Sequence, residues 1–284
     1  MNPLTAALLG IIQGITEFLP ISSTAHLTLT GKFLGLIDSD HPEAWTQFIA
    51  VMQLGTLVAT LLYFWREIVR MTGAVRSDLR AGSLTKPWHG WSVDTRLALG
   101  IALGTLPVGI IGFAFKRIIE GTLTKSTAVI AASLIVLAGL LWIAERVSKK
   151  TRVLDSLSPT DALLIGCAQA LALVPGSSRS GTTLTGAMFL GFTREAAARF
   201  SFLLSIPAVA ASGLFEMIRI DETVFELGMA NLAIATVVSA VSGYAAIAWL
   251  LRYLMRHTVM VFVWYRIALG ILLVALLAAG YLEH

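Results

Sequence analysis

Two stretches decide the fold. Each is apolar, but a break near its middle divides it into two halves that are too short to cross a membrane as a helix. Residues 3–36 are PLTAALLGIIQGITEFLPISSTAHLTLTGKFLGL, and residues 162–192 are ALLIGCAQALALVPGSSRSGTTLTGAMFLGF. Pro20 breaks the first and Pro175-Gly176 the second, and the Ser and Thr residues that follow are typical of a new helix beginning with an N-cap. Each half has about 14–17 residues, or roughly 21–25 Å of helix, against a hydrocarbon core of about 30 Å. Each stretch is therefore either a re-entrant hairpin or a crossing helix broken in the middle.

The amino-acid composition indicates that these stretches lie in a membrane. Hydrophobic residues make up 56% of the 284 residues, charged residues 13%, and the mean hydropathy is +0.80. Soluble domains average roughly 45–50% apolar and about 25% charged residues, so a soluble core cannot bury this much apolar surface. We therefore predict an all-α polytopic membrane protein. Besides the broken stretches, six segments are long enough to span the bilayer, namely 46–65, 97–115, 126–144, 200–218, 227–251 and 258–282.

The charged residues and the single cysteine exclude several classes of site. A net charge of +4 is expected of a membrane protein with Lys and Arg in its cytoplasmic loops. No basic stretch is interleaved with aromatic residues, so we expect no nucleic-acid partner. Cys167 is alone, which excludes a disulfide framework and a cysteine metal site. Glu216 and Arg266, the charges within predicted spans, are interpreted as structural residues whose side chains reach an interface.

The two broken stretches resemble each other, which predicts an internal repeat. Gly10-x-x-Gln13 precedes the first break, and Gly166-x-x-Gln169 precedes the second with a one-residue difference in spacing to the proline. Each stretch is followed by three long apolar spans. We therefore predict a single membrane domain, 1–284, with repeat one at about 1–155 (hairpin 3–36) and repeat two at about 156–284 (hairpin 162–192).

The distribution of basic residues favours the hairpin interpretation. If neither broken stretch crosses the membrane, the segments around 66–96, 146–152, 194–199 and 252–266 share one side and hold 15 Lys and Arg residues, against five on the other side. If both broken stretches cross the membrane, one side holds 11 Lys and Arg residues and the other side holds nine. The excess of cytoplasmic basic residues in membrane proteins therefore favours six transmembrane helices and two re-entrant hairpins, arranged as two inverted repeats. Both chain termini are then outside, and the hairpin tips meet near the middle of the bundle.

The first break gathers polar side chains that are suited to acid–base chemistry. Gln13 and Glu17 are four residues apart and share one helical face, and Ser23 and His26 share a face beyond the break. An ionisable residue inside the membrane is a functional candidate by default, which applies to Glu17. A packing role for His26 is the alternative, and Ser22, Ser23 and Thr24 also suit simple helix caps.

The second break carries the stronger signal, which is for anion binding. Small residues let backbone N–H groups approach a ligand, and the N-terminus of the following helix favours negative charge. Arg179 adds a planar fork that matches phosphate oxygens, although a structural arginine that caps helix carbonyls is the alternative. The Gly-x-x-x-x-Gly-Lys pattern of a P-loop is absent. The candidate phosphate-binding residues across the two breaks are Ser22, Thr24, Ser177, Ser178, Ser180, Gly181 and Thr183.

Over essentially its whole length the chain resembles the bacterial undecaprenyl-diphosphatase family, also called the bacitracin-resistance undecaprenyl pyrophosphate phosphatases. The resemblance rests on QGITEFLPISSTAH at 13–26 and PGSSRSGTT at 175–183. It implies inverted repeats with re-entrant helices. It also implies removal of one phosphate from a C55 lipid diphosphate at the outer face of the bacterial inner membrane, which recycles the glycan carrier for cell-wall synthesis and gives bacitracin resistance.

The resemblance also implies roles for individual residues. The acidic motif falls on Gln13 and Glu17, the nucleophile on Ser23, the histidine on His26 and the phosphate-binding arginine on Arg179. The metal is expected to be Mg²⁺ or Ca²⁺ held by Glu17 and Gln13. Because a glutamine supplies no charged ligand, Glu17 has to do most of that work. We expect Ser23 to attack the terminal phosphorus with Glu17 or His26 as general base.

The resemblance and the architecture leave some expectations open. The partners expected are the polyprenyl diphosphate lipid, the bilayer and a second copy of the chain in a homodimer, with an active site that opens to the periplasmic face. Broken helices in inverted repeats are also how secondary transporters are built, so an inverted-repeat transporter or flippase for a lipid phosphate is the alternative function.

Overall fold

The computed structural model describes residues 1–37, 42–82, 86–115, 126–218 and 228–282, and nearly all regular structure within them is helical. Six helices are long and apolar enough to cross a membrane, which confirms the six predicted spans and an integral membrane protein. They are α3 (Pro42–Tyr63), α5 (Val93–Ala114), α7 (Thr127–Val147), α10 (Arg194–Ile218), α12 (Met229–Leu254) and α13 (Met260–Ala278). The shorter helices are α1 (Pro3–Phe18), α2 (Ser23–Phe33), α4 (Trp65–Arg80), α8 (Pro159–Ala170) and α9 (Arg179–Phe189), with single turns η2 (Trp88–Gly90), η4 (Leu154–Ser156) and η5 (Leu171–Leu173).

Both broken stretches fold as two short helices, as their prolines predict. Helices α1 and α8 each begin with a proline, where the missing N–H is one that a helix leaves unpaired. Helices α2 and α9 each begin after a serine N-cap. The Ser22 hydroxyl accepts the N–H of Ala25 at 3.3 Å, and the Ser178 hydroxyl accepts the N–H of Gly181 at 3.1 Å. These caps share a positive φ, 76° at Ser22 and 66° at Ser178, which is costly for a residue with a side chain and often marks a functional site.

The helix boundaries correct the sequence alignment of the two breaks. Alignment on the prolines pairs Ser23 with Ser178 and needs a one-residue gap. In the structure α1 and α8 begin at 3 and 159, and α2 and α9 begin at 23 and 179, so both starts differ by 156 residues. The capping serines, 22 and 178, differ by the same number. Ser23 therefore corresponds to Arg179, and the two breaks present different chemical groups from the same backbone position.

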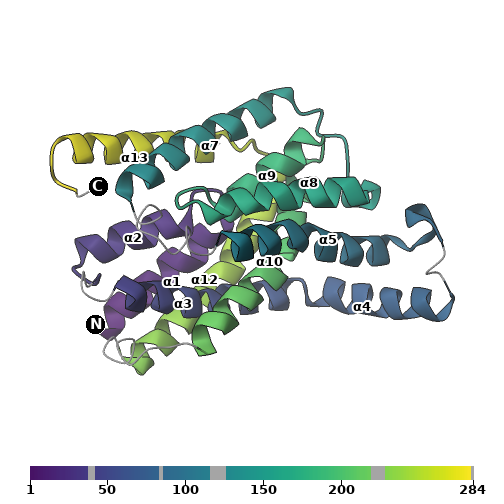
Figure 1. Ribbon diagram of the computed structural model, residues 1–284, viewed down its shortest axis with the longest axis horizontal. Helices are drawn as coiled ribbons and strands as arrows, with labels where there is room; N and C mark the ends of the chain where they lie inside the picture. Colours follow the sequence, from purple (N-terminus) through teal and green to yellow (C-terminus); the bar gives the residue numbers. More distant parts are fainter. Residues whose placement is uncertain (38–41, 83–85, 116–125, 219–227, 283–284) are drawn as a thin grey trace.

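The short helix pairs pack against the long helices (Figure 1). Helix α1 packs on α12 and α8 packs on α5, while α3 packs on α10 and α7 on α13. Glycines allow the first two contacts. A Cβ at Gly14 would lie 2.6 Å from the N of Gly243, and one at Gly166 would lie 2.2 Å from the carbonyl oxygen of Gly104. Both chain termini are at one end of the molecule, and the far end of α4 projects from the opposite end (Figure 1).

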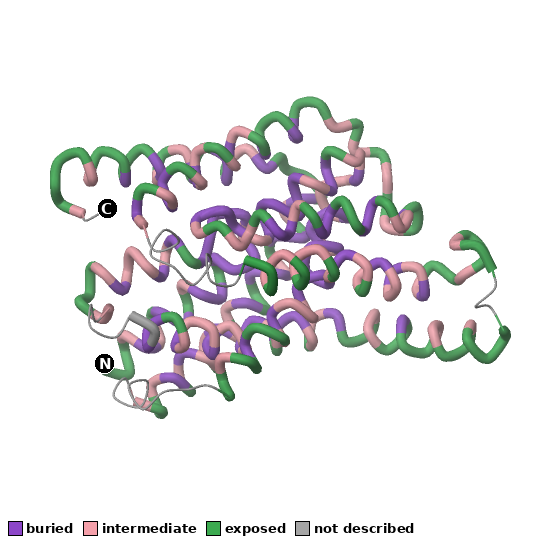
Figure 2. The backbone as a smooth tube through the Cα atoms, viewed as in Figure 1, coloured by how far each residue is buried: buried purple, intermediate pink, exposed green. Residues whose placement is uncertain are grey.

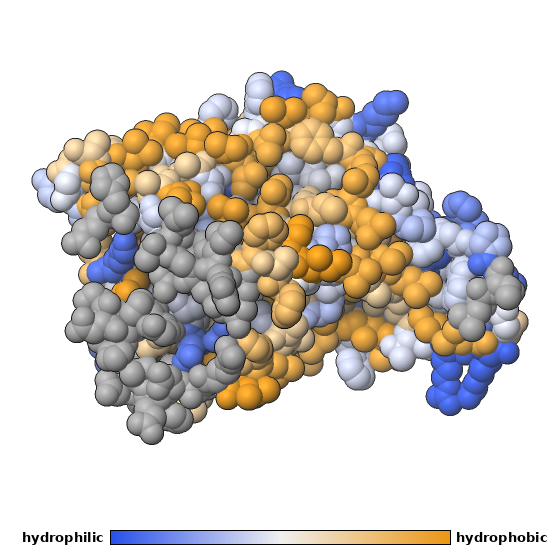
Figure 3. All heavy atoms as spheres, in the orientation of Figure 1, coloured by the Kyte–Doolittle hydropathy of each residue, from blue (hydrophilic) through white to orange (hydrophobic). Residues whose placement is uncertain are grey.

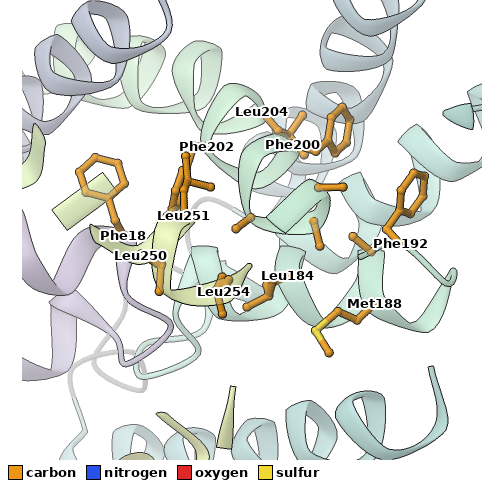
Figure 4. Close-up of a cluster of buried hydrophobic side chains, with 14 of the residues drawn as sticks. Phe18, Leu184, Met188, Phe192, Phe200, Phe202, Leu204, Leu250, Leu251 and Leu254 are labelled. Carbon is orange, nitrogen blue, oxygen red and sulfur yellow. The ribbon is translucent and has the colours of Figure 1, made fainter. Parts of the chain in front are cut away.

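The most deeply buried part of the chain surrounds the breaks, whereas the outer faces of the long helices are exposed (Figure 2). A cluster of aromatic and aliphatic side chains fills the interior beside the first break (Figure 4). There Phe18 meets Phe202 edge to face with the ring centroids 5.2 Å apart. Orange apolar atoms cover the middle of the visible surface, and blue polar atoms gather near α4 (Figure 3). This pattern suits a bundle whose outer surface is solvated by lipid.

Much of the segment 66–96, expected as a connection between spans, is helical where the structure describes it. It contains α4, a helix with acidic and basic residues on one side, followed by the turn η2 and the start of α5. Its side chains are mostly exposed; only Met71 of α4 is buried.

Candidate functional site

The two breaks meet in the interior of the bundle. Ser180 of the second break donates from its hydroxyl to the carbonyl of Leu19 in the first, at 3.1 Å. Arg179 and Glu17 form an ion pair between the same two segments. The residues that the sequence singled out at two places 162 positions apart therefore lie in one site.

Glu17, near the C-terminus of α1, lies at the centre of this site and is 7% exposed. Its Oε2 accepts a hydrogen bond from the Ser23 hydroxyl at 2.6 Å and another from Nε2 of Gln13 at 3.1 Å. Its Oε1 accepts from the guanidinium of Arg179. A buried carboxylate is tolerated when charged and neutral donors satisfy it in this way. The arrangement places the Glu17 carboxyl group in contact with both a serine hydroxyl and a guanidinium.

Ser23 is the first residue of α2 and has the geometry of an activated nucleophile. Its hydroxyl donates to a carboxylate within ordinary hydrogen-bond reach, and that carboxylate is oriented by a third group, Arg179. A nucleophile, a base and an orienting group in hydrogen-bond contact are the general signature of covalent catalysis. The N-terminus of α2 lies directly behind Ser23, so its partial positive charge favours negative charge at this hydroxyl.

Both ring nitrogens of His26 contact groups other than the Ser23 hydroxyl. Its Nδ1 lies 2.7 Å from the carbonyl oxygen of Ser22, and because a carbonyl can only accept, Nδ1 carries the proton. Its Nε2 then accepts from the hydroxyl of Tyr265 at 2.6 Å, and the two rings stack with centroids 5.6 Å apart. Both ring nitrogens are thus engaged, and His26 joins the cap of α2 to helix α13.

Arg179 opens α9 and places its guanidinium across the breaks. Besides Glu17 it contacts the carbonyl of Ser205 on α10 at 3.3 Å. Two neighbouring residues fix the backbone at Arg179. The Thr183 hydroxyl donates to the carbonyl of Arg179 at 2.7 Å, and Ser178 caps the helix. Within the second break, Thr183 and Ser178 therefore act on the backbone that carries Arg179.

A cavity of about 380 Å³ opens beside these groups. Its polar end is formed by both helix starts, and its walls by apolar residues of α5 and α10, among them Val108 and Val209. Phe113 of α5, 86% exposed, lies at its rim. The predicted site residues that line the cavity are Glu17, Ser22, Ser23, Thr24, Ser178 and Arg179. The other predicted site residues are not in its lining: His26 is half-buried, and the buried ones are Gln13, Ser177, Ser180, Gly181 and Thr183.

The sequence analysis misjudged Arg266 of α13. The residue was expected to reach an interface, but it is 0% exposed and lies between the two breaks. Its guanidinium donates to the carbonyl of Pro20 at 3.3 Å and to those of Gly176 and Ser177 at 3.2 and 3.1 Å. It also reaches the carbonyls of Ser133 and Leu134 on α7. A charge within an apolar span was the available signal, and it indicated function as readily as snorkelling.

The described residues contain no cluster of three or more His, Cys, Asp or Glu side chains suited to a metal ion. Among the residues that the structure describes, Glu17 is the one carboxylate that lines the cavity. Oε1 of Gln13 beside it is buried without a hydrogen-bond partner, so a neutral oxygen ligand is available there. One carboxylate with one neutral oxygen suits Mg²⁺, which often binds through one or two carboxylates and substrate phosphates.

Comparison with known proteins points to one family. The sequence model of the family described as bacitracin resistance protein BacA matches residues 6–272. A relative from Syntrophobacter fumaroxidans (strain DSM 10017 / MPOB), named undecaprenyl-diphosphatase, is 52% identical over 272 residues that cover 95% of each chain. Relatives of the same name from Chloroherpeton thalassium and Gloeobacter violaceus are 47% and 48% identical, and cover 100% and 98% of this chain and 99% and 92% of their own.

Proposed function

The chain belongs to the bacitracin resistance protein BacA family, and we propose that the site between its two breaks hydrolyses undecaprenyl diphosphate. The products are undecaprenyl phosphate and inorganic phosphate, so the reaction recycles the lipid carrier of cell-wall synthesis and supports resistance to bacitracin. The observation that carries this proposal is the 2.6 Å hydrogen bond from the Ser23 hydroxyl to Glu17, with Arg179 on the same carboxylate. A carrier that only moves its substrate has no need of an aligned nucleophile and base.

The architecture that we propose has two re-entrant hairpins, α1–α2 and α8–α9, in two inverted repeats. Support comes from the matching 156-residue offsets and from reciprocal packing, in which α1 of the first half lies on α12 of the second and α8 of the second lies on α5 of the first. Arg266 was one of the 15 basic residues assigned to the cytoplasmic side. When the buried Arg266 is left out of the count, the cytoplasmic side holds 14 Lys and Arg residues and the other side five, which still favours this topology.

The same topology places the chain termini and the open side of the cavity at the periplasmic face of the bacterial inner membrane. The cavity walls come from the second halves of α5 and α10, which run toward the end that carries both termini (Figure 1). Lipid diphosphates left by polymer synthesis present their headgroup at that face. The apolar walls beside Val108 and Val209 then receive the first part of the prenyl chain, and the headgroup lies at the two helix starts.

In the first chemical step, the Ser23 oxygen attacks the terminal phosphorus while its proton moves to Glu17. The new Ser–O–P bond forms as the bond from that phosphorus to the bridging oxygen breaks. Undecaprenyl phosphate leaves and takes up the proton that Glu17 received. Transfer over a 2.6 Å hydrogen bond needs no movement of either residue.

In the second step, water attacks the phosphoserine and gives its proton to Glu17. The bond between phosphorus and the serine oxygen breaks, Ser23 regains its proton, and inorganic phosphate leaves. Arg179 and the first backbone N–H groups of α2 and α9 stabilise the charge on the phosphoryl oxygens in both steps. These two helices begin at the cavity and present their positive ends to the same place.

We also propose that a divalent cation, Mg²⁺ or Ca²⁺, accompanies the substrate. Glu17 and the unpartnered Oε1 of Gln13 would hold it together with diphosphate oxygens. The chemistry it supplies is neutralisation of the diphosphate charge. Because Arg179 already pairs with Glu17, this site alone holds a cation weakly, so we expect the cation to bind together with the diphosphate.

The experiment that tests the proposed function measures phosphate release from undecaprenyl diphosphate by the purified protein in detergent with Mg²⁺ or Ca²⁺. Ser23→Ala is expected to lose at least about a hundredfold in kcat, because it removes the attacking oxygen. Near-full activity in this variant would remove Ser23 from the mechanism. No release by the unaltered protein with either cation would favour the lipid-phosphate transporter instead.

A further inference from the structure

Gln169 of α8 is a buried polar residue that the hydrolytic mechanism leaves unused. Its side chain is 0% exposed, and it contributes to the lining of the cavity that holds Glu17 and Arg179. Neither its Oε1 nor its Nε2 has a hydrogen-bond partner. Buried polar groups in folded proteins are nearly always paired, so an amide with both ends unpaired calls for a specific cause.

Comparison with the first break supplies that cause. Gln169 stands 156 positions after Gln13, the same offset that relates the helix starts. Gln13 donates its Nε2 to Glu17, four residues further on, at 3.1 Å. The residue four positions after Gln169 is Leu173, whose side chain offers no acceptor. The second amide therefore occupies the same backbone position as the first without its internal acceptor.

The location of Gln169 indicates which ligand would satisfy it. An amide N–H is a donor, and the cavity already gathers donors for an anion, namely the Arg179 guanidinium and the starts of α2 and α9. Glu17 is the charged acceptor among the described residues of the lining, but Gln13, Ser23 and Arg179 already donate to it. A phosphate oxygen that enters between the two helix starts therefore meets a donor that has no competing partner.

We propose that Gln169 is a substrate-binding residue that donates its side-chain N–H to a phosphate oxygen of the lipid diphosphate. This assignment rests on the proposed hydrolase function and adds a recognition group to it. Gln13 and Gln169 then have different tasks from equivalent positions: Gln13 orients the base, and Gln169 binds the headgroup. The amide stays unpaired in the free protein because its partner arrives with the substrate.

The test compares Gln169→Met with the matched variant Gln13→Met, since methionine keeps the length of the side chain and removes its polar atoms. Loss of a hydrogen bond to a charged oxygen is expected to raise the KM for undecaprenyl diphosphate in Gln169→Met about tenfold to a hundredfold, with a smaller change in kcat. Measured at saturating Mg²⁺, which offsets the loss of Gln13 as a cation ligand, Gln13→Met is expected to lower kcat more than it changes KM, because Gln13 contacts the base. Gln169→Glu adds a negative charge beside the diphosphate and is expected to raise KM further than methionine does.

Thermal unfolding in detergent separates binding from a structural role. Because the amide has no partner in the free protein, Gln169→Met is expected to unfold at the same temperature as the unaltered protein or at a higher one. A lower unfolding temperature with an unchanged KM would show that Gln169 supports the fold and would overturn the assignment. An unchanged KM in both Gln169 variants, with the unaltered protein active, would overturn it as well. Absence of phosphate release by the unaltered protein would overturn the proposed function, and this inference with it.

Discussion

Arg266 provides a sharp test of the site because one side chain joins both breaks. In Arg266→Met the carbonyls of Pro20, Gly176 and Ser177 lose the donor that the structure gives them at 3.1–3.3 Å. A buried carbonyl left without a donor costs about 1–3 kcal/mol, so three such losses amount to about 3–9 kcal/mol. Gly176 lines the cavity, where water can replace the lost donor. The carbonyls of Pro20 and Ser177 remain without a donor, so we expect the free energy of unfolding to fall by about 2–6 kcal/mol.

Arg266→Met should also reduce activity, because the two breaks carry the proposed nucleophile, Ser23, and the proposed phosphate-binding arginine, Arg179. A displacement of about 1 Å between reacting groups costs on the order of a hundredfold in rate, and we expect a loss of that size in kcat/KM. Arg266→Lys keeps the charge but not the planar fork, so one ammonium group cannot reach all three carbonyls. Its losses should lie between those of Arg266→Met and the unaltered protein.

Thermal unfolding in detergent and phosphate release from undecaprenyl diphosphate measure the two effects on the same samples. Arg256→Met is the matched control, since Arg256 is exposed in the connection between α12 and α13. The control should leave both readouts unchanged. If Arg266→Met has the same unfolding temperature and the same rate of phosphate release as Arg256→Met, other contacts hold the breaks together and the reasoning is refuted.

Three further predictions follow from the site and its topology. Arg179→Ala should lower kcat/KM by a hundredfold or more, on the order of several kcal/mol in transition-state stabilisation, and a loss below about tenfold would count against its role. His26→Asn should lower kcat by less than about tenfold, whereas loss of a general base typically costs about a hundredfold or more; a larger loss would return the histidine to the proton transfer. Cysteines placed at Arg80 and Met255, in a background without the native cysteine, should be labelled from the cytoplasmic side and one at Tyr281 from the periplasm. Labelling of the first two from opposite sides would contradict the hairpin topology.

Much of the fold could be predicted because the bilayer imposes a simple rule on the sequence. A spanning helix needs about 20 apolar residues, and all six predicted segments are helices in the structure. The breaks were equally visible, since proline ends one helix and serine starts another at both places. The boundaries were less accurate: α10 begins at Arg194 rather than near 200, because its first turns pack inside the protein and need not be apolar along their whole surface.

The composition of the site could be predicted, but the roles of its members could not. Glu17, Ser23 and Arg179 were recognisable as charged or nucleophilic groups in apolar surroundings, and the structure brings these three together. His26 carries the same chemical signal, yet its ring nitrogens are committed to Ser22 and Tyr265. The partners of the His26 ring depend on Tyr265 of α13, which lies far from it in the sequence.

The sequence by itself determined that this chain is a membrane protein, where its helices break, and which polar residues stand at the breaks. Those properties follow from local composition, because each segment that crosses a bilayer must by itself be long enough and apolar enough to do so. Only the tertiary structure decided that Arg266 joins the two breaks and that Gln169 lacks a partner where Gln13 has one. Such contacts depend on which residues of distant helices meet in the interior. No local pattern in the chain specifies them.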